Sequence, residues 1–329
     1  MPRIVTAVVM FLAFLVSACN RSDPSMNNID PKAGLLAARA GFTTQVTPNE
    51  RSTDGPAPVP PANIFTLVHY PAAEGKLAAY VSPDPKDGKK HPAIVWAHGG
   101  IGGIGKEFWE KATPDNDQTA QAFRQAGIIM MIPSWVGEND NPGFYSYHWA
   151  QLGNALKAAE YLATLPYVDA TRIYMGGHST GGTVALQTAV APGPFKAVFA
   201  YGGVIDIGKT VSYRKGQELP FDLNDPQEAK EAYLRSPIHF IGAVKSPTFY
   251  FEGADSAYVA DAQRLTQRAR ELNVPVQATI IKGGNHFNVL APINALIAKK
   301  IVQEWQTGTP LKFEENEAQQ AFDAMFKRR

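Results

Sequence analysis

The feature that most constrains the fold is an alternation of two hydrophobic periods between about residues 63 and 306. Short apolar, β-branched runs alternate with longer segments of helical period. The first two runs have no helix between them and predict an antiparallel hairpin, whereas a helix candidate follows each later run. This order predicts an α/β fold: an eight-stranded, mostly parallel sheet with helices on both faces. The predicted strands are 64–70, 76–82, 92–100, 127–135, 172–179, 195–203, 247–253 and 276–284.

Charge and composition exclude several classes of function. The chain of 329 residues has 31 Lys and Arg against 30 Asp and Glu, and it contains no long basic run. A nucleic-acid partner therefore has no support. Its histidines show no ligand-like spacing, so we expect no metal site. With one cysteine there can be no disulfide within the chain.

The first residues predict a targeting segment. "MPR" precedes the apolar run "IVTAVVMFLAFLV", which is too short to span a bilayer comfortably, and the run ends in "VSAC". This resembles a bacterial lipoprotein signal, with residues 1–18 removed and Cys19 lipidated. A secretory signal with an incidental cysteine is the alternative. The polar, proline-rich segment 19–62 then predicts a flexible tether to a membrane of the cell envelope. Asn20 slightly favours the outer membrane because it is not the aspartate that signals inner-membrane retention.

The stretch "MGGHSTGG" (175–182) predicts a nucleophilic serine. Ser179 ends a predicted strand and precedes the helical segment "TGGTVALQTAV". A sharp strand-to-helix turn of this kind exposes the serine hydroxyl, and Gly177 and Gly181 fit where neighbouring elements pass too close for a Cβ. The turn also places the Thr180 N–H at a helix N-terminus, where it can stabilise an oxyanion.

A serine needs a base and a group that orients the base. Asp255 and His286 each follow a later strand, and the order Ser, Asp, His is that of the α/β-hydrolases. Asp206, after the sixth strand, is an alternative acid. The loop "HGGIGG" follows the third strand, so the N–H of Gly100 or Ile101 is the candidate second oxyanion donor.

These motifs resemble a known family. "VDATRIYMGGHSTGG", "LRSPIHF", "SPTFYFEGADSAYV" and "KGGNHF" are similar to the prolyl-oligopeptidase-like serine hydrolases, including acyl-aminoacyl-peptidase and dienelactone-hydrolase relatives. The resemblance implies an α/β-hydrolase domain over 63–306 without a cofactor. It also implies that Ser179 is the nucleophile, His286 the base and Asp255 its orienter.

Two loops are candidates for substrate contact. The loop after the fourth strand carries Trp135 and Tyr145, although its aromatic side chains could equally pack locally. Segment 206–246 is long for a connection and predicts a small cap that carries Tyr213. The tail 307–329 has apolar residues at helical spacing and should dock on the body.

The sequence therefore predicts a membrane-tethered enzyme that hydrolyses a small ester, amide or short peptide through an acyl-enzyme. The alternative is a catalytically inactive surface lipoprotein that uses the same fold as a binding module. An activated serine separates the two hypotheses, because a binding module has no need of a strained serine turn.

Overall fold

The computed structural model describes residues 30, 32–45, 54–209, 221–314 and 316–326. The predicted signal segment 1–18, Cys19 and Tyr213 lie outside the described residues. Within them, no helix is long and apolar enough to cross a membrane.

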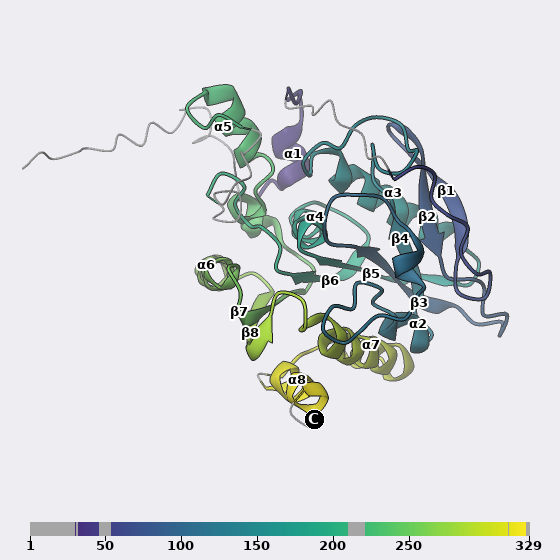
Figure 1. The fold of residues 1–329 in the computed structure, drawn as a ribbon. Helices are drawn as coiled ribbons and strands as arrows, with labels where there is room; N and C mark the ends of the chain where they lie inside the picture. The colour runs from purple at the N-terminus through teal and green to yellow at the C-terminus, as the bar shows by residue number, and fades with distance from the viewer. Residues whose placement is uncertain (1–29, 31, 46–53, 210–220, 315, 327–329) are drawn as a thin grey trace, which may run out of the picture.

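The described residues form the predicted eight-stranded sheet, in the order β1-β2-β4-β3-β5-β6-β7-β8 (Figure 1). The first hairpin is antiparallel, and β2 also pairs antiparallel with β4, whereas all the other neighbours are parallel. All seven residues of β3 are buried, as expected for a strand covered on both faces. The strands are β1 Thr66–Ala72, β2 Gly75–Val81, β3 His91–Ala97, β4 Ile129–Pro133, β5 Val168–His178, β6 Phe195–Tyr201, β7 Thr248–Asp255 and β8 Val276–Asn285.

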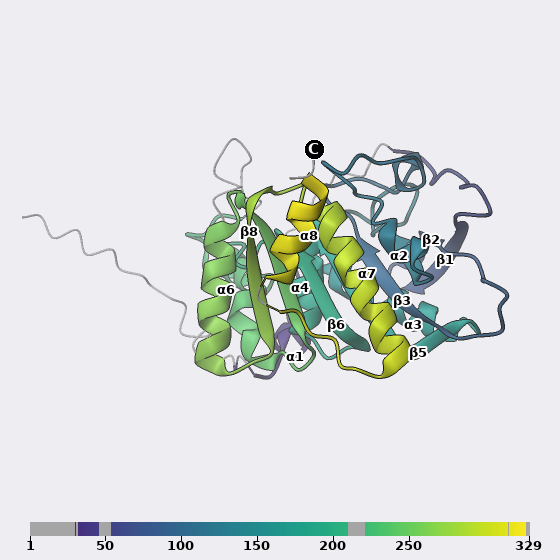
Figure 2. The same ribbon diagram turned by 90° about the horizontal axis from the view of Figure 1, so that it is seen from below.

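Helices cover both faces of the sheet, and a separate apolar core lies between the sheet and the helices on each face (Figures 1 and 2). One face packs against α1 Leu35–Arg39, α3 Ala150–Thr164, α4 Thr180–Ala189, α6 Val259–Leu272 and the short helix Pro237–Ala243. The other packs against α2 Ala122–Gln125, α7 Leu290–Thr307 and α8 Glu317–Phe326. Connections between the strands contain the short helix Lys106–Phe108 and α5 Pro226–Tyr233.

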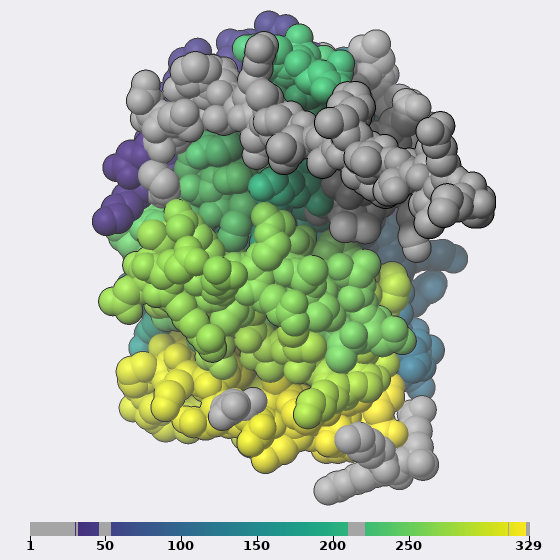
Figure 3. Space-filling model, turned by 90° about the vertical axis from the view of Figure 1, so that its left-hand side faces the viewer, coloured from purple at the N-terminus to yellow at the C-terminus, as the bar shows by residue number. Residues whose placement is uncertain are grey.

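The C-terminal segment docks on the body. Helix α8 buries Ala318 and Phe322 in the core under α7, and Gln319 donates a hydrogen bond to the Lys282 carbonyl in β8. Figure 3 shows the resulting face, with green side chains around α6 and β8 above the yellow C-terminal segment.

The segment predicted as a flexible tether packs on the body wherever it is described. Leu35 is fully buried, and the Arg39 guanidinium donates hydrogen bonds to the carbonyls of Leu234, Trp149 and His148. Arg39 and Arg235 also lie over the Trp149 ring, at 4.3 Å and 4.7 Å from its centroid. The described residues of the predicted tether, 32–45 and 54–62, thus contact distant parts of the fold through apolar and basic side chains.

The described part of the predicted cap, residues 206–209 and 221–246, belongs largely to the body. Ile238, Phe240 and Ile241 are buried in the core shared by α3, α4 and α6. Arg235 and Glu231 form a fully buried ion pair at 2.8 Å. Ile238, Phe240 and Ile241 thus pack beside the sheet, a placement that the composition of the segment did not reveal.

Candidate active site

The turn around Ser179 has the strained geometry of a nucleophile elbow. β5 ends at His178, α4 begins at Thr180, and Ser179 between them has φ 56° and ψ −115°. Such a conformation costs a non-glycine residue about 1–3 kcal/mol, so it persists only where its surroundings enforce it. Here the Ser179 N–H donates to the Tyr201 carbonyl at 2.7 Å.

The two elbow glycines lie where the sequence predicts close approach. A Cβ at Gly177 would lie 2.3 Å from the Gly181 oxygen, and a Cβ at Gly181 would lie 2.1 Å from the Ala97 oxygen. The elbow is therefore packed directly against the end of β3. This contact brings the loop after β3 to the serine.

The base candidate His286 lies immediately after β8 and pairs with Glu252 of β7. His286 Nδ1 is 3.0 Å from Glu252 Oε2, and Glu252 is fully buried. The other oxygen, Oε1, accepts the Gly253 N–H at 2.8 Å. The geometry fits an Nδ1–H that donates to the Glu252 carboxylate, which leaves the Nε2 lone pair as the acceptor. This is the tautomer that a general base requires.

In the structure Glu252, and not the predicted Asp255, contacts the candidate base His286. β7 continues past its predicted end at Gly253, and Asp255 pairs in register with Asn285 while its side chain is exposed. A register shift between Gly253 and Asp255 separates the two carboxylates. The sequence did contain an indication that Glu252 has a partner. Glu252 is a charged residue inside the apolar strand "TFYFEG", and a buried charge is stable only when it is paired or hydrogen-bonded.

The alternative acid, Asp206, is engaged elsewhere. Its buried carboxylate pairs with Arg264 at 2.7 Å and lies 3.8 Å from His239. Among the residues that the structure describes, Glu252 is the carboxylate in contact with the His286 ring.

Two aromatic rings pack against the His286 ring. Tyr258 stacks on it at 4.7 Å between centroids and 17° between planes, and His178 lies at 4.4 Å. His178 Nε2 is 2.9 Å from the His286 carbonyl oxygen, which makes Nε2 the donor, and Nδ1 accepts from Gln118 Nε2 at 2.8 Å. Burial lowers the pKa of His178 to about 3. The elbow histidine is thus a neutral support that joins the elbow to the base.

In the described residues no hydrogen bond joins Ser179 Oγ to His286. Hydrogen bonds between catalytic groups are often long without substrate and tighten in the reacting complex. Ser179 follows His178 in the chain, and the His178 ring packs against the candidate base His286.

The predicted oxyanion donors are the N–H groups of Thr180 and of Gly100 or Ile101 in the loop after β3. Within segment 99–104, Gln118 accepts from Gly99, Glu138 from Gly102, and Asp54 from Gly103. Gly100 and Ile101 donate to no acceptor among the described residues, and neither does Thr180 at the first position of α4. The Thr180 hydroxyl donates to the Gly100 carbonyl at 2.6 Å, which fastens the loop to the elbow. Among the described residues, the N–H groups of Thr180, Gly100 and Ile101 are therefore available as oxyanion donors, and the Thr180–Gly100 contact brings the loop to the elbow.

The predicted substrate residues are mostly buried. Trp135 is 4% exposed and packs in the apolar core, while Tyr145 is 7% exposed and its ring packs against Tyr147 and His148. The exposed aromatic residue of this loop is Phe144. Within the described residues, no group of three or more His, Cys, Asp and Glu side chains gathers as metal ligands would.

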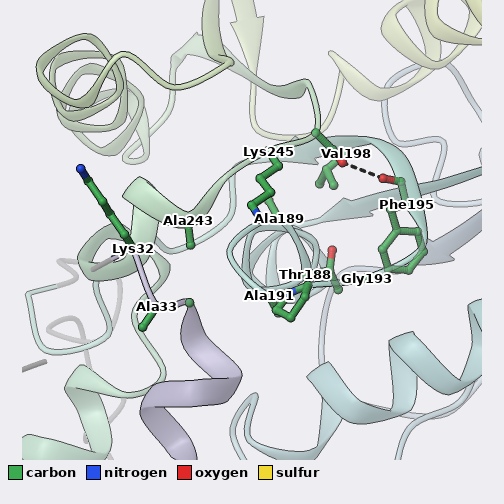
Figure 4. Close-up of a pocket in the computed structure, with 13 residues that line it drawn as sticks. Lys32, Ala33, Thr188, Ala189, Ala191, Gly193, Phe195, Val198, Ala243 and Lys245 are labelled. Carbon is green, nitrogen blue, oxygen red and sulfur yellow. Dashed lines mark hydrogen bonds between the residues drawn. The ribbon is translucent and has the colours of Figure 1, made fainter. Parts of the chain in front are cut away.

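A cavity of about 270 Å³ lies away from this site. It is bordered by Lys32 and Ala33 before α1, Thr188 at the end of α4, and Lys245 (Figure 4). Ser179 lies at the opposite end of α4, a helix of ten residues and so about 15 Å long. The cavity is therefore not part of the candidate active site.

Glu138→Gln is expected to remove part of the pH dependence of stability. Burial raises the pKa of Glu138 to about 8 from its ordinary 4.5, and nearby Asp54 adds to the rise. The folded protein therefore holds a proton that the unfolded chain releases. The contribution is fully present below about pH 4.5 and is lost as the pH rises through about 8. Denaturant unfolding at several pH values should show the wild type losing stability relative to Glu138→Gln. Parallel curves would contradict this assignment.

Comparisons with known proteins agree with the fold and with membership of a serine hydrolase family. The model of the Prolyl oligopeptidase family matches residues 114–307, which include Ser179, Glu252 and His286. "Dipeptidyl-peptidase 5" of Porphyromonas gingivalis is 25% identical over 244 residues, which cover 68% of this chain and 34% of that protein. The chain thus spans about a third of that relative's length.

Two further proteins match the chain. "Uncharacterized peptidase YtmA" of Bacillus subtilis is 22% identical over 241 residues, covering 70% of this chain and 89% of that protein. The structure of an esterase from Pyrobaculum calidifontis has a TM-score of 0.54 at 18% identity, covering 74% of this chain and 86% of that one. The structural likeness shows a shared fold, and the family match spans more than half of the chain. The chain belongs to the prolyl oligopeptidase family.

Proposed function

We propose that this chain hydrolyses esters, amides or short peptides through an acyl-enzyme formed on Ser179. The observation that carries the proposal is the buried Glu252–His286 hydrogen bond beside a serine held at φ 56°. Family membership makes a serine hydrolase the expected chemistry. A relative called a dipeptidyl-peptidase and a structure called an esterase support both classes of substrate.

Each residue has one role in the proposed reaction. Ser179 Oγ attacks the substrate carbonyl carbon, and its proton passes to His286 Nε2. Glu252 stabilises the resulting imidazolium through the Nδ1–H bond. The tetrahedral oxyanion accepts from the Thr180 N–H and from Gly100 or Ile101. His286 then protonates the leaving alkoxide or amine, the acyl-enzyme forms, and water releases the acid by the same steps.

We also propose that the enzyme acts at a membrane of the bacterial cell envelope, slightly favouring the outer membrane, with Cys19 acylated. This part rests on the sequence of residues 1–20 alone. A lipid anchor would determine where the enzyme is located. The reaction would still be determined by the site around Ser179.

Fluorophosphonate labelling tests the proposed function. An activated serine should take one phosphonyl group per chain on the peptide that contains Ser179, and Ser179→Ala should take none. Heat-denatured wild type controls for non-specific reaction. A folded wild-type protein that stays unlabelled would instead support the inactive binding module.

A further inference from the structure

The stretch 54–58, N-terminal to the sheet, lies directly against the oxyanion loop, residues 99–104. The Asp54 carboxylate accepts the Gly103 N–H, and Asn139 Nδ2 donates to the Gly55 carbonyl at 3.1 Å. The same Asn139 accepts the Ile104 N–H through Oδ1 at 2.8 Å. One amide side chain therefore joins the N-terminal stretch to the loop.

This stretch is held firmly enough to act as a support. Ala57 is buried in the same apolar core as Ile104 and Phe108. The Tyr80 hydroxyl donates to the Pro58 carbonyl at 2.8 Å, which fixes the stretch to β2. Asp54 thus extends toward the loop from a backbone that is anchored three to four residues further along the chain.

The oxyanion loop needs such support because of its composition. Four of its six residues are glycines, which have no side chains to pack, and Gly100 and Gly102 have φ of +86° and +144°. A glycine backbone has many accessible conformations, so its position must come from contacts made by other segments. The N–H groups of Gly99, Gly102, Gly103 and Ile104 each donate to a side chain outside the loop. Only Gly100 and Ile101 in the loop lack an acceptor among the described residues.

We propose that Asp54 is a positioning residue for the oxyanion hole. By accepting the Gly103 N–H, it holds the loop so that the N–H groups of Gly100 and Ile101 point to the developing oxyanion. The inference rests on the proposed function. It adds that a residue outside the family match at 114–307 contributes to transition-state binding. Its effect should appear on the tetrahedral species and not on substrate binding, because the ground-state carbonyl has not yet gained the negative charge.

Three variants of the full chain test the proposal. Asp54→Ala removes the acceptor from an exposed position and should lower kcat about 10-fold at unchanged KM, less than the loss of a whole oxyanion donor. Asp54→Asn keeps a carbonyl oxygen as acceptor and should remain within about threefold of wild type. Asp84→Ala is the matched control, since Asp84 is also exposed and also accepts a backbone N–H, from Lys86, near the opposite end of the sheet. It should match wild type.

A second readout separates positioning from a merely structural role. For a trifluoromethyl ketone, which forms a tetrahedral adduct on the serine, the inhibition constant should rise in Asp54→Ala by the factor that kcat/KM falls. Equal kcat and equal inhibition in Asp54→Ala and wild type would overturn the proposal, while one fluorophosphonate label per chain would still uphold the proposed function. A rise in KM alone would also overturn it. An unlabelled wild type would overturn both.

Discussion

Glu252→Gln is expected to lower kcat/KM by about 10³–10⁴-fold, whereas Asp255→Asn stays within about threefold of wild type. Glutamine keeps the volume of the buried side chain but cannot stabilise the imidazolium as a carboxylate does. Its amide can also turn an N–H toward His286 Nδ1, which favours the tautomer with the proton on Nε2, where the base cannot accept one. Asp255 is exposed, and among the described residues it is Glu252 that forms the hydrogen bond and ion pair with His286.

The comparison of these two variants decides which carboxylate belongs to the triad. Each variant replaces one carboxylate by its amide. The two variants therefore change the net charge by the same amount and differ only in which carboxylate is removed. Steady-state hydrolysis of an activated ester measures both, with thermal unfolding to establish that each variant is folded. A large loss in Asp255→Asn together with near wild-type activity in Glu252→Gln would restore the acid predicted from the sequence.

Gly202→Ala is expected to lower kcat/KM by at least about 100-fold. A Cβ at Gly202 would lie 2.3 Å from Glu252 Oε2 and 2.3 Å from His286 Cε1, closer than any real contact. Gly202 also has φ +56°, which disfavours alanine further. The added methyl group must therefore push the acid and the base apart or distort the end of β6.

The matched control is Gly153→Ala in α3, where a Cβ would meet nothing within 4 Å. Alanine there should leave kcat/KM unchanged and should stabilise the helix by about 0.5–1 kcal/mol. Kinetics and thermal unfolding of both variants test the pair. If Gly202→Ala retained wild-type kcat/KM, the observed Glu252–His286 arrangement would not be the active one.

The fold was predictable because its signals are local. Strands such as 92–100 and 195–203 are continuous apolar runs, and each is followed by a segment of helical period. The elbow was predictable for the same reason, since a strand, a glycine-flanked serine and a helix follow one another within a few residues. The position of His286 was predictable because this residue comes immediately after the last strand, β8.

The partner of His286 and the contacts of the loop 99–104 depended on parts of the fold that the sequence does not reveal locally. Choosing Glu252 over Asp255 required knowing that β7 extends beyond Gly253 and shifts register there. The Asp54–Gly103 hydrogen bond joins residues 49 apart in the chain, and Asp54 sits in a polar stretch that resembles a linker. Composition identified this stretch as polar and proline-rich, but it could not show which carbonyls and carboxylates face the loop.

The most direct test of the acyl-enzyme is to trap it. The full chain is mixed with p-nitrophenyl acetate, quenched in acid within the first turnover, and analysed by peptide mass spectrometry. The proposed mechanism predicts one added acetyl group on the peptide that contains Ser179, a burst of p-nitrophenol equal to the enzyme concentration, and neither in Ser179→Ala. Turnover without a covalent adduct, or an adduct that persists in Ser179→Ala, would contradict the assignment of Ser179 as the nucleophile.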